Sequence, residues 1–307
     1  MSFGTREFLR WFAEHRRLER ELARLQAQAA EWARFFPPGH FYSPLPSRDE
    51  VNEALARGGG GPPFPGIDLN ESGQLARLEK FAGWYAEQPW PEQAAPGWRF
   101  HLDNNSYGHF DAIMLYGMLR EARPRRVIEV GSGFSSAAML DLNERVFAGA
   151  MQFTFIDPDM NRLRPLLRPE DEQRVTLIER RVQEVPLETF ATLADNDVLF
   201  IDSSHVSKIG SDVNRLYFEV LPALAPGVLI HIHDVAGNFE YPREWFEEGR
   251  AWNEQYLLRA FLMHNTAYRI ELFTGWLFNT RHEWFRLHMP LCARGGGGQL
   301  WLRKLAR

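Results

Sequence analysis

Residues 125–136 read Arg-Arg-Val-Ile-Glu-Val-Gly-Ser-Gly-Phe-Ser-Ser, and this stretch decides the fold of the 307-residue chain. It predicts an apolar strand, a tight turn and the start of a helix. Gly131 and Gly133 can take positive φ, and they let a ligand approach the backbone. The first amides of the following helix would face that ligand. In an open α/β sheet, such a turn lies beside the crevice where ligands bind.

Further apolar runs with strand character follow, separated by helical patterns. The helix expected between the fourth and fifth runs has an apolar face, and Ser211 is placed to cap it. Nearly continuous apolar strands separated by helices indicate a parallel sheet covered on both faces. The sequence therefore predicts an α/β fold with a doubly wound, mostly parallel, seven-stranded, Rossmann-like sheet. The expected strands are 127–130, 153–156, 175–178, 198–201, 228–232, 268–273 and 299–303.

Residues 1–100 predict a helical N-terminal extension with a Pro/Gly-rich linker, ahead of a core domain over 101–307. Residues 5–36 look helical, and their apolar side chains recur at alternating steps of three and four, as in a heptad repeat. Packing on the chain's own domain and homodimerisation through this helix are both open interpretations. The apolar series is Phe8, Trp11, Leu18, Leu22, Leu25, Ala29, Trp32 and Phe36.

Composition excludes several classes of protein. The net charge is −5, so no basic surplus calls for nucleic acid or an anionic membrane as partner. No apolar run approaches the ~20 residues that span a bilayer. Cys292 is the single cysteine, which rules out an intramolecular disulfide and fits a cytoplasmic location.

The glycine turn by itself does not identify its ligand. A dinucleotide fingerprint requires a third glycine where this chain has Ser136. Glu129, before the turn, suits a cationic ligand better than a pyrophosphate. With Asp157 and Asp202 at the ends of the second and fourth strands, it predicts an electronegative rim that suits a sulfonium cofactor. An NAD-linked oxidoreductase stays the alternative.

Polar side chains gather where the fourth and fifth strands end: Asp202, His205, His233 and Asp234. The carboxyl ends of neighbouring parallel strands share one rim of the sheet. His205 is the leading candidate for a catalytic general base, and His233 is the second. The same four residues form a candidate site for a divalent metal, which would acidify and orient a hydroxyl. A metal-dependent hydrolase is therefore a further alternative. His231 lies deeper on its strand, and we expect it to be a hydrogen-bonded core residue.

The segment after the fifth strand, residues 238–262, is rich in aromatic side chains. Aromatic walls with a few polar groups are typical of small-molecule pockets. We expect Tyr241, Trp245, Trp252 and Tyr256 to contact the substrate, although the same residues would also suit the packing of a lid helix.

Several of these segments resemble one family. Residues 129–133 resemble motif I of class I S-adenosylmethionine-dependent methyltransferases, and residues 155–157 resemble their acidic motif after the second strand. Residues 199–205, 231–235, 241–245 and 252–256, taken in order, resemble a bacterial group of small-molecule methyltransferases, similar to methyltransferase domain family 24. The likeness covers about residues 65–303.

The resemblance implies S-adenosylmethionine as cofactor and a small-molecule acceptor, methylated most readily at a hydroxyl oxygen, with or without a metal. It implies that Asp157 binds the ribose and that Asp202 belongs to the cofactor rim. A non-catalytic assembly protein that uses the N-terminal heptads is the remaining alternative. The other implied cofactor residues are Glu129, Gly131, Ser132 and Gly133 at the methionine part and Val182 and Gln183 at the adenine. Asn105 and Tyr107 are expected to close over the cofactor.

Overall fold

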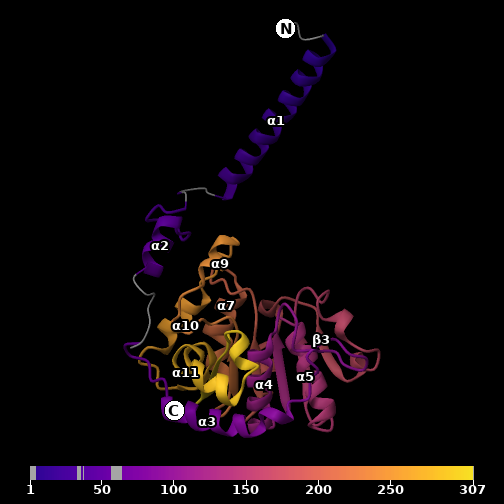
Figure 1. Cartoon of the computed structure of the whole chain (residues 1–307), viewed down its shortest axis with the longest axis vertical. Coiled ribbons are helices and arrows are strands. Elements are labelled where there is room, and N and C mark those ends of the chain that lie inside the picture. The colour runs from indigo at the N-terminus through magenta and orange to yellow at the C-terminus, as the bar shows by residue number, and fades with distance from the viewer. Residues whose placement is uncertain (1–4, 33–35, 37, 57–63, 307) are drawn as a thin grey trace. The chain divides into compact units, whose positions relative to one another are not determined.

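The computed structural model describes residues 5–32, 36, 38–56 and 64–306 and divides the chain into two compact units, residues 1–58 and 59–307 (Figure 1). This division differs from the boundary expected at residue 100. The hydrophobic core of the second unit includes buried side chains from before that boundary, namely Phe64, Phe81, Trp90 and Phe100. This stretch therefore belongs to the core domain.

The first unit contains α1 (Thr5–Trp32) and α2 (Arg48–Ala56). On α1, the described part of the heptad stripe is exposed, with Trp11, Leu18, Leu22 and Leu25 between 50% and 57% accessible. The side chains of Phe8, Ala29 and Trp32 and the glycine-rich part of the linker lie outside the described residues. No helix in the described ranges is long and apolar enough to cross a membrane.

The second unit is built on a seven-stranded sheet in the order β3-β2-β1-β4-β5-β7-β6. Neighbouring strands pair in parallel except around β7, which is antiparallel to β5 and β6. Each predicted strand is confirmed to within one residue. The strands are β1 (Arg126–Val130), β2 (Gln152–Ile156), β3 (Val175–Ile178), β4 (Val198–Ile201), β5 (Leu229–Ile232), β6 (Tyr268–Phe273) and β7 (Leu300–Lys304).

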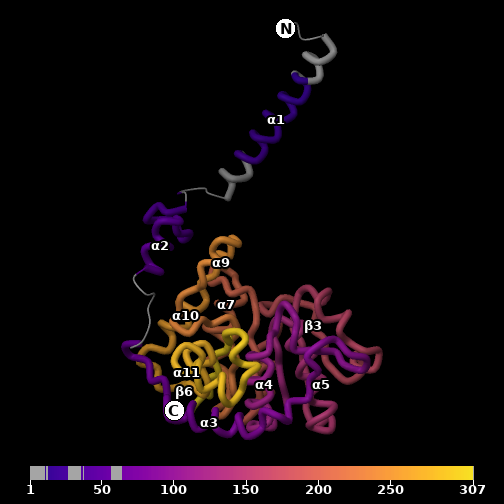
Figure 2. Tube along the Cα trace, viewed as in Figure 1, coloured from indigo at the N-terminus to yellow at the C-terminus, as the bar shows by residue number. Residues whose placement is uncertain are grey.

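Helices surround this sheet, and the trace in Figure 2 runs from purple at α3 (Glu71–Trp84) to yellow at α11 (Thr274–His288). The helix expected after Ser211 forms as α7 (Asp212–Arg215), a π-helical turn over Leu216–Val220 and α8 (Leu221–Ala223). The Ser211 hydroxyl accepts a hydrogen bond from the Asn214 amide at 3.1 Å, as a cap should. The helices are α3 (Glu71–Trp84), α4 (His109–Ala122), α5 (Phe134–Arg145), α6 (Leu187–Phe190), α7 (Asp212–Arg215), α8 (Leu221–Ala223), α9 (Arg243–Glu247), α10 (Glu254–Leu262) and α11 (Thr274–His288).

Strand register places the functional residues side by side. The chain leaves β1 toward β2 and β3 and returns to β4 on the other side, so the order reverses between β1 and β4. Val130 pairs with Ile201, and Ile201 pairs with Ile232. The residues that follow these strand ends, Gly131, Asp202 and His233, must therefore be neighbours at the crevice where open α/β sheets bind ligands.

Candidate active site

A cavity of about 1050 Å³ opens at the carboxyl ends of the central strands. Most predicted cofactor residues line it. The lining includes Asn105, Tyr107, Gly131, Ser132, Gly133, Asp157, Val182, Gln183 and Asp202.

The two glycines of the turn have different roles. Gly131 has φ +83°, and a Cβ there would lie 1.7 Å from the backbone oxygen of Asp202. Gly133 has φ 173°, which is extended backbone, so it does not use the positive φ that glycine allows. A Cβ at Gly133 would instead lie 2.7 Å from Cδ of the flexible Arg162 side chain, which also lines the cavity. Only Gly131 is required by both its conformation and its surroundings.

Asp157 holds the loop after β2 against the glycine turn. Its two carboxylate oxygens accept hydrogen bonds from the amides of Ser132 and Asp159, each at 2.9 Å. A carboxylate has further acceptor capacity. Asp157 therefore remains able to accept hydroxyl groups from a ligand in the cavity.

Glu129 lies behind the cavity wall rather than on it. Its side chain is fully buried and accepts hydrogen bonds from the hydroxyls of Ser135, at 2.5 Å, and Ser136. Ser136 in turn accepts a hydrogen bond from the Gly133 amide at 3.0 Å. Burial raises the pKa of Glu129 to about 8. Glu129 thus anchors the start of α5, a role that its place in the motif did not reveal.

We expect Glu129→Gln to flatten the pH dependence of stability. The folded-state pKa of Glu129 lies above its ordinary value of 4.5, so its contribution to stability is complete below pH 4.5 and is lost as the pH rises toward 8. The loss is at most about 1.4 kcal/mol per pH unit. Urea unfolding of both proteins at pH 5.5 and 8 measures it. A parallel loss of stability in the variant would contradict this pKa.

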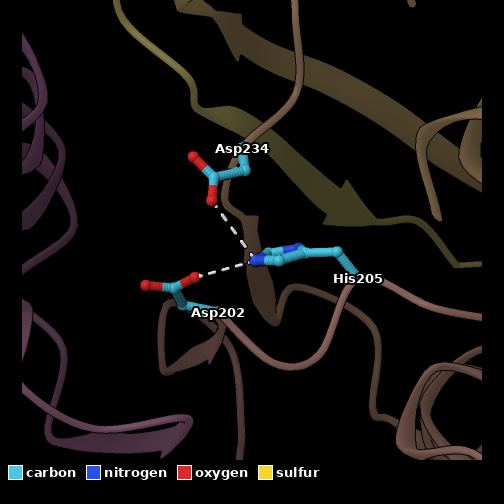
Figure 3. Close-up of side chains that lie close together, drawn as sticks. All are labelled: Asp202, His205 and Asp234. Atoms are coloured by element: carbon cyan, nitrogen blue, oxygen red, sulfur yellow. Dashed lines mark ion pairs between the residues drawn. The ribbon is translucent and has the colours of Figure 1, made fainter. Parts of the chain in front are cut away.

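Three of the four polar residues predicted to gather after β4 and β5 converge in the structure: Asp202, His205 and Asp234 (Figure 3). His205 Nε2 lies 3.2 Å from Oδ1 of Asp202 and 3.3 Å from Oδ2 of Asp234. One ligand atom from each of these residues lies within 4.8 Å of the others. His205 and Asp234 have φ +58° and +56°, values that non-glycine residues rarely adopt. Strain of this kind persists where the surroundings over-determine it, commonly at functional sites.

The carboxylates around His205 favour the protonated form of its ring. Burial lowers the pKa of His205, but hydrogen bonds to Asp202 and Glu254 outweigh burial and raise the pKa to about 10. A ring that holds both protons must lose one before it can accept another. The role of His205 as general base stays a prediction.

His233 and His231 lie deeper. His233 also lines the cavity, but its Nε2 is 3.9 Å from Asp234 and outside the converging set. Neither ring nitrogen of His231 has a hydrogen-bond partner among the described residues, whereas a hydrogen-bonded histidine was expected. Its ring stacks on Phe200 at 3.7 Å, and burial holds the pKa of His231 well below its ordinary value.

The predicted substrate residues divide into two pairs. Trp245 and Trp252 line the cavity, with ring centroids 5.1 Å apart, and Trp252 lies 4.4 Å from the His205 ring. Tyr241 and Tyr256 pack against each other at 5.7 Å and do not line the cavity. Trp245 and Trp252 are placed where they could contact a substrate, which stays a prediction, whereas Tyr241 and Tyr256 serve packing.

Two residues of the site had no predicted role. Glu254 Oε2 lies 2.9 Å from His205 Nδ1, and Arg162 reaches the cavity beside Gly133. Glu254 belongs to the segment Trp252-Asn253-Glu254, which resembles the methyltransferase family, and this resemblance was the only sign of a role for it. Because Glu254 and His205 lie 49 residues apart in the sequence, their contact could not be predicted from spacing.

Comparison with known proteins gives two matches in sequence. Residues 128–235 match the family described as a methyltransferase domain. A protein of unassigned function from Archaeoglobus fulgidus is 33% identical over 174 residues, which is 54% of this chain and 77% of the relative.

Solved structures show a weaker likeness. The O-methyltransferase TomG from Streptomyces achromogenes, in complex with S-adenosylmethionine, is 14% identical with a TM-score of 0.41, over 78% of this chain and 92% of that chain. A structure of CmcI with Mg and S-adenosylmethionine is 19% identical with a TM-score of 0.40, over 73% and 84%. A putative caffeoyl-CoA O-methyltransferase from Staphylococcus aureus is 11% identical with a TM-score of 0.43, over 84% and 98%.

With its glycine turn at the β1/β4 switch point and its matched domain, this chain is a class I S-adenosylmethionine-dependent methyltransferase. More particularly, its residues 128–235 place it in the family described as a methyltransferase domain. Its cofactor is S-adenosylmethionine. The resemblance drawn from the ordered motifs is confirmed, and the oxidoreductase, hydrolase and assembly-protein alternatives are set aside.

Proposed function

We propose that this enzyme methylates an oxygen of a small molecule, assisted by a divalent cation held by Asp202, His205 and Asp234. One observation carries the proposal: the ligand atoms of these three residues converge within 4.8 Å on the cavity that the glycine turn and Asp157 also line.

The chemistry of the three residues fits a cation. Two carboxylates and one imidazole are acceptable ligands for Mg²⁺, Mn²⁺, Fe²⁺ or Zn²⁺. His205 Nε2 lies between the same two carboxylates, 3.2 Å from Asp202 and 3.3 Å from Asp234. Positive charge at this point is therefore already favoured. A bound divalent cation would orient an acceptor hydroxyl and lower its pKa.

The chain's own residues supply alignment. Asp157 and the glycine turn hold the cofactor on one side of the cavity, and Trp245 and Trp252 offer flat apolar surface to the acceptor on the other. Transfer forms an oxygen–carbon bond as the sulfur–methyl bond breaks; the hydroxyl proton is lost to solvent and S-adenosylhomocysteine leaves. Holding the two reactants in line supplies much of the rate. A small-molecule acceptor, no nucleic-acid or membrane partner, and a homodimer through α1 stay predictions.

We expect the wild-type protein to bind one Mn²⁺ and Asp234→Asn to lose at least about tenfold in affinity, because one anionic ligand is removed. Titration calorimetry with Mn²⁺, in the presence of S-adenosylhomocysteine, measures both. Asp212→Asn is the matched control: Asp212 also lines the cavity but accepts hydrogen bonds from Ser204 instead. Absence of Mn²⁺ binding to the folded wild-type protein would refute the cation site.

A further inference from the structure

At the start of α10, Asn253 and Glu254 hold the loop that carries His205 through hydrogen bonds. The amides of Asn253 and Glu254 both donate to the His205 carbonyl, at 3.0 and 3.1 Å. The Asn253 side chain accepts from the Ser207 amide at 2.6 Å and donates to the Ser207 carbonyl at 3.2 Å. These backbone contacts hold His205 at its strained φ of +58°.

The Glu254 carboxylate adds a contact to the ring itself. Its side chain is only 2% exposed, and Oε2 lies 2.9 Å from His205 Nδ1. A carboxylate oxygen at this distance accepts a hydrogen bond from Nδ1–H, and that hydrogen bond keeps Nδ1 facing Glu254. The opposite nitrogen, Nε2, is then the one that faces Asp202 and Asp234. Carboxylates that hold the far nitrogen of a ligating histidine set the direction of the ring in many metal sites.

The segment that holds the His205 loop also contributes to the aromatic wall of the cavity. Trp252, immediately before Asn253, lies 4.4 Å from the His205 ring and forms part of the aromatic wall. The wall and the histidine loop are therefore tied through one short segment.

We infer that Glu254 is a positioning residue that aims Nε2 of His205 at Asp202 and Asp234. The effect on cation binding rests on the proposed function, because a ring turned the wrong way would remove one of the three ligands of the proposed cation site. It assigns Glu254 no contact with the cofactor or the acceptor.

The test compares Glu254→Gln with Glu248→Gln. In the first variant, the neutral carboxamide accepts the Nδ1 proton less strongly and can also donate, so it no longer fixes which ring nitrogen faces Asp202 and Asp234. We expect calorimetry to show Mn²⁺ affinity about 10- to 100-fold weaker in Glu254→Gln, with S-adenosylhomocysteine affinity within about threefold of wild type. Glu248 is an exposed carboxylate paired with Arg250 near the same wall, so Glu248→Gln should bind Mn²⁺ as the wild type does.

A second readout separates this inference from the cation site. Crystal structures of the metal-free wild type and Glu254→Gln should show the His205 ring turned away from Asp202 and Asp234 in the variant. If the wild type binds no Mn²⁺, the proposed function fails, and ring orientation alone decides the role of Glu254. An unmoved ring with unchanged Mn²⁺ affinity would overturn the inference. Glu254→Asp, which keeps the charge on a shorter arm, should retain more affinity than Glu254→Gln; a greater loss would count against positioning by charge.

Discussion

Gly131→Ala should abolish measurable binding of S-adenosylmethionine, with at least about a 100-fold loss in affinity. The new Cβ would lie 1.7 Å from the Asp202 backbone oxygen, so the turn between β1 and α5 would have to move away from β4. The alanine at position 131 would also have to adopt φ +83°, which costs about 1–3 kcal/mol for a residue other than glycine. Calorimetry with S-adenosylhomocysteine measures the affinity, and thermal unfolding measures the stability.

Two other glycines separate the steric effect of the new Cβ from the cost of the positive φ. Gly149 has φ +77° with open space around its Cβ position, so Gly149→Ala reports the conformational cost alone. Gly133 has extended backbone and would meet only the flexible Arg162 side chain, so Gly133→Ala should weaken cofactor binding by less than about tenfold. If Gly133→Ala proved more damaging than Gly131→Ala, the close approach to Asp202 would not be what limits the turn.

His205→Asn should lower methyl transfer by about 100-fold or more while cofactor affinity changes little. The substitution removes the imidazole that unites Asp202 and Asp234, and the loss of a group that organises such a site costs several kcal/mol. Asparagine tolerates the left-handed conformation at this position, so the backbone is preserved. Release of S-adenosylhomocysteine, measured across a panel of hydroxylated aromatic acceptors with Mn²⁺ present, gives the rate.

His233→Gln is the informative comparison for that experiment. His233 lines the same cavity, but its Nε2 lies 3.9 Å from Asp234 and takes no part in the converging set. We expect its loss to reduce the rate by about tenfold. A larger loss for His233→Gln than for His205→Asn would move the main catalytic role to His233 and favour the metal-free alternative.

The strands could be predicted from sequence because each is a short apolar run bounded by turn residues, and β4 (Val198–Ile201) and β5 (Leu229–Ile232) are buried over their whole length. Parallel strands also end at one rim, so Asp202, His205 and Asp234 were foreseeable neighbours. The boundary expected at residue 100 differed from the structure because Phe81 and Phe100 pack into a core whose other residues lie far along the chain.

Sequence alone determined the reaction class, the cofactor and the rim on which the chemistry takes place, because these depend on local motifs and on the order of strand ends. Tertiary structure decided what each group does there. Glu129 was expected at the cofactor, but Ser135 and Ser136 enclose its carboxylate behind the wall. Glu254, 49 residues away from His205 in the sequence, contacts the ring nitrogen Nδ1. Burial and distant partners set protonation and ring direction, and neither can be read from residue spacing.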